Sequence, residues 1–180
     1  STLDKGIIPQ LLSDALSVNF DTKIGHDYIK DVESRFADYH NIEKKIPFDI
    51  KYFNMITEGG LAAKTLSVIL AGTGIGKTLT MCHMAAANLS KGYNVLYITN
   101  EMSEIRISER IDANLLDIPI SELKLYPHDT FMKKIDRLKS KTHGNLIVKE
   151  YPTSQASVLN FKHLLNELKL KKNFIPQIIY

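Results

Sequence analysis

Apolar residues follow two different spacings along the chain. In the first 45 residues they recur every three or four positions, which is typical of amphipathic helices. This spacing predicts one helix over residues 6–17 and a second over about 26–40, with Ile29, Val32 and Phe36 on its apolar stripe. After Phe48 short, almost continuous apolar runs alternate with further stretches of helical spacing. Such runs are typical of strands that are buried on both faces of a sheet.

The apolar runs after Phe48 predict four strands separated by helices. The strands are expected at residues 65–70, 94–99, 145–149 and 174–180, and the main helices at 79–90, 103–116, 129–138 and 155–170. Ser103 and Asp129 stand where helix N-caps are expected. Strands that alternate with helices form a parallel sheet with right-handed crossovers. The predicted fold class is therefore α/β, with helices flanking a parallel sheet.

A boundary is expected at the polar stretch 41–47, which ends in Pro47. Proline disfavours helix at the residue before it. Residues 1–45 then form a helical linker, and residues 46–180 belong to the α/β domain. The linker has too few apolar groups to fold alone. We therefore expect it to dock on its own domain or on a neighbouring subunit.

Composition excludes several classes of protein. The chain has 180 residues, 44% of them hydrophobic and 24% charged, with one cysteine and a net charge of +3. These values exclude a disordered chain, a disulfide scaffold and a zinc site with four cysteines. The absence of any run near 20 apolar residues excludes a membrane span. Residues 131–180 hold ten Lys and Arg against three Asp and Glu, so the positive charge is concentrated there.

The glycine-rich segment from Ala71 to Thr78 has the pattern of a phosphate-binding loop, with alanine in place of its first glycine. It lies between a predicted strand and a predicted helix, which is the context such a loop requires. The glycines allow backbone N–H groups to converge on phosphate, and the helix N-terminus favours the same negative charge. Lys77 can reach the β- and γ-phosphates, and the Thr78 hydroxyl can bind Mg²⁺. The candidate nucleotide-binding residues are Gly72, Thr73, Gly74, Ile75, Gly76, Lys77 and Thr78.

Glu101 follows the predicted strand 94–99 directly. The carboxyl ends of parallel strands face one crevice, so this carboxylate is expected near the phosphates. It can polarise the water that attacks phosphorus. It can equally be an early-turn glutamate that favours the dipole of the helix behind Ser103. Spacing alone leaves both interpretations open.

Several segments together resemble the DnaB-type replicative helicases, and most closely those of T-even bacteriophages. They are the phosphate loop, the sequence Asn-Glu-Met-Ser at 100–103, the approach segment 46–61 with its Gly-Gly-Leu, and the runs at 110–117 and 164–174. The resemblance implies a RecA-like ATPase core in a ring-shaped hexamer that encircles single-stranded DNA. It implies ATP or another nucleoside triphosphate as the substrate, Mg²⁺ as the cofactor, and Glu101 and Lys77 as catalytic residues. It further implies subunit contacts through the linker helices, primase and a helicase loader as partners, and a phage protein in the bacterial cytoplasm.

Family members carry a second magnesium-associated aspartate at the end of a strand. The best candidate strand, 174–180, stops before any aspartate. The sequence is therefore expected to be the first part of a motor domain, without its DNA-binding loops and arginine finger and inactive alone. Two alternatives are a RecA-type recombinase and a non-catalytic nucleotide-binding module. Cys82 is expected to be a small core residue, and the basic run from Lys133 to Lys141 favours a solvated helix face over a DNA contact.

Overall fold

The computed structural model describes residues 25–41, 43–152 and 156–180. The chain divides into two compact units, residues 1–42 and 43–180. In the first unit, α2 covers Val32–Tyr39 and buries none of its residues. The helix is shorter than expected because the Asp27 carboxylate accepts hydrogen bonds from the N–H groups of Ile29 and Lys30, which holds a turn before the helix. The helix expected over 6–17 lies outside the described residues.

The second unit contains the sheet. Its described strands are β1 (Val95–Thr99), β2 (Leu146–Glu150) and β3 (Ile178–Ile179). They are parallel, in the order β2-β1-β3. Val95 pairs with Leu146 on one side and with Ile178 on the other. The predicted parallel α/β architecture is confirmed.

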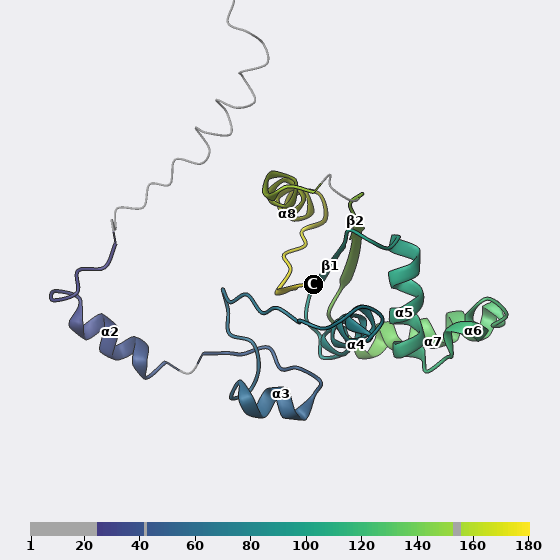
Figure 1. The fold of residues 1–180 in the computed structure, drawn as a ribbon, viewed down its shortest axis with the longest axis horizontal. Helices are drawn as coiled ribbons and strands as arrows, with labels where there is room; N and C mark the ends of the chain where they lie inside the picture. Colours follow the sequence, from purple (N-terminus) through teal and green to yellow (C-terminus); the bar gives the residue numbers. More distant parts are fainter. Residues whose placement is uncertain (1–24, 42, 153–155) are drawn as a thin grey trace, which may run out of the picture. The chain divides into compact units, whose positions relative to one another are not determined.

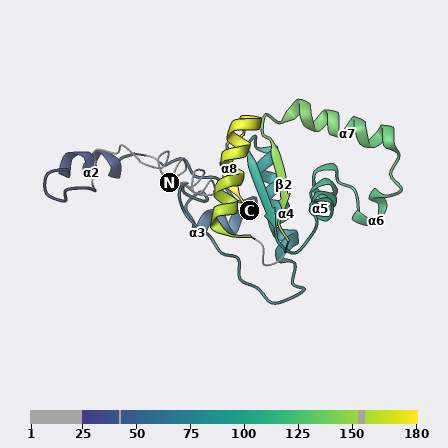
Figure 2. The same cartoon turned by 90° about the horizontal axis from the view of Figure 1, so that it is seen from above.

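Helices cover both faces of the sheet (Figures 1 and 2). Val95 and Tyr97 pack toward α4 (Lys77–Ser90) and α5 (Glu104–Leu116). Leu96 points to the other face and packs against α8 (Val158–Lys172). This alternation follows from the two-residue period of a strand, and it explains why β1 is apolar at every position up to Ile98.

The remaining helices of the second unit are α3 (Lys51–Ile56), α6 (Ile120–Leu123) and α7 (His128–Lys141). Ser103 caps α5 as expected, because its hydroxyl accepts a hydrogen bond from the N–H of Arg106. Asp129 does not cap α7, and this expectation is wrong. The helix begins one residue earlier, after Pro127, so Asp129 lies in the first turn. There its charge favours the helix dipole.

The approach segment closes on itself just before the phosphate loop. Ile46 and Leu61 form an antiparallel bridge with two N–H···O contacts of 2.8 Å. Gly60 has a φ of +132°, and a Cβ there would lie 2.2 Å from the carbonyl oxygen of Ile46. Only glycine fits this close approach. This explains why a glycine precedes Leu61.

Residues 65–70 are not a strand in the structure, so the first predicted strand is wrong here. Leu66, Val68 and Leu70 are 90%, 79% and 94% exposed. A strand needs a neighbour for its backbone hydrogen bonds. β3 is two residues long, so its outer edge offers little for residues 65–70 to pair with. The described sheet therefore has three strands where four were expected.

None of the helices in the described parts of the chain combines the length and the apolar character that crossing a bilayer requires.

Candidate functional site

The phosphate loop lies at the N-terminus of α4. Gly76 is the N-cap, with a left-handed backbone (φ +97°, ψ +22°), and Gly74 has a φ of +75°. The carbonyl of Gly76 accepts the N–H of Thr80, which closes the first turn of the helix. Residues with a side chain adopt this conformation only at a cost. The glycine spacing therefore serves the turn that joins the loop to the helix.

Lys77 folds back over the loop. Its Nζ donates hydrogen bonds to the carbonyl oxygens of Ala71 at 2.9 Å and Gly72 at 2.7 Å. The side chain thus links the two ends of the loop. The same contacts hold the ammonium group beside the loop backbone, where a bound phosphate would add negative charge.

Thr78 is the second residue of α4 and is half-exposed. No residue in the described ranges forms a hydrogen bond with its hydroxyl, whereas the Thr80 hydroxyl donates to the Gly76 carbonyl. An uncommitted hydroxyl oxygen at a helix N-terminus suits Mg²⁺, which takes few protein oxygens and completes its shell with phosphate oxygens and water. The loop therefore fits a magnesium–nucleotide complex.

Glu101 lies in the turn between β1 and α5 and is exposed. Thr99 fixes this turn, because its hydroxyl accepts the N–H of Met102 and donates to the Met102 carbonyl. Glu101 precedes the cap residue Ser103 and is outside the helix, and the acidic residue of the first turn is Glu104. The carboxylate of Glu101 forms no ion pair or hydrogen bond within the described ranges. This arrangement leaves it available to a ligand at the carboxyl end of β1.

Glu104 joins the ends of two adjacent strands, a role that sequence reasoning missed. Its carboxylate accepts the backbone N–H of Glu150 at 3.0 Å, and Glu150 accepts the N–H of Glu104 at 3.4 Å. Lys149 adds an ion pair with Glu104 at 3.6 Å. Glu150 is thereby occupied in holding α5 to β2. The pairing of Thr99 with Glu150 in the sheet could not be read from the sequence.

The core below the loop contains Cys82, Tyr97 and Tyr180. The Cys82 thiol lies 3.8 Å from the Tyr97 hydroxyl, and the two tyrosine rings stack at 6.2 Å. Burial raises the pKa of the Cys82 thiol and of Tyr97, and it raises the pKa of Tyr180 to about 12. A thiol held protonated is unreactive. Cys82 is therefore a core residue, as expected from its helical neighbours.

The family model described as "ATPase: KaiC" matches residues 46–175. The chain belongs to this family of ATPases. It is 45% identical over 179 residues to a "DnaB-like replicative helicase" of Enterobacteria phage T4, an alignment that covers 98% of this chain and 38% of the relative. It is 30% identical over 134 residues to "DNA repair protein RadA" of Rickettsia conorii, covering 69% of this chain and 30% of that protein. The chain thus spans 38% of the first relative and 30% of the second.

These matches confirm the resemblance to DnaB-like helicases and the RecA-like ATPase fold. The family match begins at Ile46, where the bridge to Leu61 forms.

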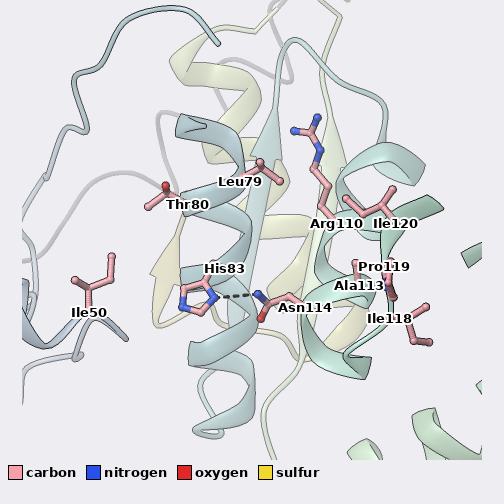
Figure 3. Close-up of a pocket in the computed structure, with 10 residues that line it drawn as sticks. All are labelled: Ile50, Leu79, Thr80, His83, Arg110, Ala113, Asn114, Ile118, Pro119 and Ile120. Atoms are coloured by element: carbon pink, nitrogen blue, oxygen red, sulfur yellow. Dashed lines mark hydrogen bonds between the residues drawn. The ribbon is translucent and has the colours of Figure 1, made fainter. Parts of the chain in front are cut away.

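A separate crevice of about 520 Å³ lies beside α4 in this KaiC-family ATPase (Figure 3). His83 hydrogen-bonds to Asn114 of α5 at 2.9 Å and lies 3.2 Å from Asp49. Lys91 also pairs with Asp49, at 3.1 Å, and its hydrogen bond is the main reason that the pKa of Asp49 is lowered. His83 therefore links α4 to α5 and to the segment before α3. The crevice contains neither the phosphate loop nor Glu101.

Proposed function

We propose that this chain is the nucleotide-binding part of an ATP-driven replicative DNA helicase. The observation that carries the proposal is the phosphate loop, which is formed at the N-terminus of α4 with Gly76 in its left-handed conformation. The similarity to a DnaB-like replicative helicase supports the choice of helicase among the activities of RecA-like ATPases.

In the proposed binding step, the N–H groups of the loop and of the first turn of α4 surround the β- and γ-phosphates. Lys77 exchanges its two carbonyl contacts for phosphate oxygens, at little electrostatic cost because a charged acceptor replaces a neutral one. The Thr78 hydroxyl would hold Mg²⁺, and the ion would neutralise negative charge on the phosphates. The residues of the loop proper are Gly72, Thr73, Gly74, Ile75 and Gly76.

In the proposed hydrolytic step, Glu101 orients a water molecule in line with the γ-phosphate. As the water oxygen bonds to phosphorus, the bond to the β–γ bridging oxygen breaks, and the carboxylate accepts the water proton. Lys77 stabilises the charge that develops on the leaving group. The exposed position of Glu101 at the end of β1 supports this role.

We further propose that residues 1–45 hold neighbouring subunits together in a hexameric ring. The apolar side chains in and before α2 stay exposed within their own unit, which supports a partner outside it. Single-stranded DNA, primase and a helicase loader are the proposed partners of the complete protein in the host cytoplasm. The exposed side chains are Tyr28, Ile29, Val32, Phe36 and Tyr39, at 48–76%.

Two variants test the ATPase proposal. Binding of a fluorescent ATP analogue to the 180-residue chain should fall at least about tenfold in Lys77→Ala, because one charge-assisted contact is worth roughly 1.5–3 kcal/mol. Glu101→Gln should keep its affinity but abolish hydrolysis in the complete protein. Lys51→Ala, which removes an exposed lysine on α3, is the control. Unchanged binding in Lys77→Ala, or retained hydrolysis in Glu101→Gln, contradicts the proposal.

A further inference from the structure

Helix α7 presents one face to the domain and the opposite face to solvent. Phe131, Ile135 and Leu138 are half-buried, and no residue of the helix is fully buried. Lys134 fixes the helix from the inner side, where its Nζ donates to the carbonyl of Leu116 and lies 5.5 Å from the ring centre of Tyr126. Figure 2 shows α7 extending beyond the sheet on the side of α5 and α6.

The outer face of α7 carries a basic stripe, defined here as Lys133, Arg137 and Lys141. The three residues are four positions apart, so they lie on one face and follow one another at about 6 Å along the helix axis. All three are exposed. Within the described parts of the chain none of them forms an ion pair or a side-chain hydrogen bond.

The carboxylates of α7 do not neutralise the basic stripe. Asp136 pairs with Lys139 at 3.5 Å. Asp129 stands four positions before Lys133 in the same row, but the contact that its carboxylate makes is with His128 at 3.4 Å. Like charges four positions apart destabilise a helix by roughly 0.2–0.5 kcal/mol per pair. Repulsion within the basic stripe therefore lowers the stability of the isolated chain. A polyanion bound along the stripe would relieve this repulsion.

We propose that the basic stripe of α7 binds the sugar–phosphate backbone of single-stranded DNA. Its cations repeat at one interval with no acid between them, which complements a chain of regularly repeated negative charges. The backbone of a single strand is flexible and can follow this straight row of cations, whereas the stiff backbone of a duplex winds around its own axis. The exposure of the three residues agrees with the solvated helix face expected from the sequence, and the proposal adds a ligand for that face.

The proposed contact is distinct from the nucleotide site. It uses no residue of the phosphate loop and requires neither ATP nor Glu101. Lys77→Ala should therefore leave it unchanged, so failure of the ATPase proposal and failure of this one can be told apart.

Fluorescence anisotropy with a labelled oligothymidylate tests the proposal on the 180-residue chain without nucleotide. The variant Lys133→Gln/Arg137→Gln/Lys141→Gln should weaken binding by about tenfold or more at low salt. For single strands each neutralised phosphate adds about 0.7 to the slope of log affinity against log salt, so the slope should fall by about 2. The variant Lys133→Arg/Lys141→Arg keeps the charges and should bind as the parent does.

The matched control removes three charges from α8 instead, by changing Lys162, Lys169 and Lys172 to glutamine. These lysines are exposed and form no ion pair in the described structure. Lys169 and Lys172 lie in the last turn of α8, as Lys141 lies in the last turn of α7. The control should retain most of the affinity. Circular dichroism must show the same helix content in every variant compared.

Four outcomes overturn the proposal. The first is an equal loss of DNA affinity in the α8 control, which would indicate attraction to net charge alone. The second is an unchanged salt slope in the α7 variant. The third is tighter binding to a duplex of the same length than to the single strand. The fourth is complete competition by polyglutamate at equal charge, which would identify the surface as one for acidic proteins.

Discussion

Gly76→Ala should separate the conformational role of the loop glycines from steric effects. Gly76 has a φ of +97°, and a Cβ added there would meet nothing within 4 Å. The change therefore adds backbone strain and no clash. A residue with a side chain pays about 1–2 kcal/mol in the left-handed region. If the loop keeps its shape, unfolding free energy falls by this amount. If the loop relaxes, the affinity for nucleotide falls instead, by about 5- to 30-fold.

Both quantities are measurable on one preparation, by urea unfolding and by titration with a fluorescent ATP analogue. The control is Gly72→Ala, whose φ lies outside the left-handed region and whose Cβ would meet only the flexible end of Ile75, at 3.0 Å. We expect a clearly smaller combined effect there. A Gly76→Ala variant that changes affinity less than about twofold and stability less than about 0.5 kcal/mol refutes the assigned role of the glycine.

Two further predictions concern the core. Ile107→Ala removes a side chain of α5 that is 0% exposed and packs against β1, so the free energy of unfolding in urea should fall by about 2–5 kcal/mol. Ile105→Ala changes a side chain that is 70% exposed and should lower it far less. Equal losses in the two variants would contradict the described core. Stability should also fall above pH ~10, because burial raises the pKa of Tyr180 to about 12, so the unfolded chain releases this proton at lower pH than the folded chain. Tyr180→Phe should flatten the decline measured by unfolding at pH 9–11, while Tyr52→Phe, on an exposed side chain, should not.

The main helices other than α3, and three of the four expected strands, could be predicted because local signals determine them. Ser103 caps α5, Ser157 and Asn160 form a capping box at α8, and the run at 95–99 is apolar on both faces because helices cover both sides of the sheet. The turn before α4 was predictable from its glycines, because Gly74 and Gly76 adopt positive φ there. These features depend on a few neighbouring residues, so one sequence is sufficient to find them.

Contacts between distant residues were not predictable in the same way. The exchange of hydrogen bonds between Glu104 and Glu150 depends on the register of β1 against β2. The link from His83 to Asp49 joins residues 34 positions apart and carries no spacing signal. Polar pairs of this kind follow from the packing of elements, whose relative placement a single sequence does not encode locally.

Residues 65–70 show what the hydrophobic pattern does encode. Burying a Leu or Val side chain fully is worth about 1.5–3 kcal/mol, so the exposed Leu66, Val68 and Leu70 represent roughly 5–9 kcal/mol, which is comparable to the stability of a whole domain. The hydrophobic pattern thus indicates that these side chains need to be buried. It does not indicate which strand would form hydrogen bonds with their backbone. A hollow of about 890 Å³ lies between this segment and β3. β3 is only two residues long, which is too short to pair with a strand at residues 65–70. The conformation of the phosphate loop in this structure is therefore fixed by the residues that join it to α4. These are Gly76, through its left-handed backbone, and Lys77, through its hydrogen bonds to Ala71 and Gly72.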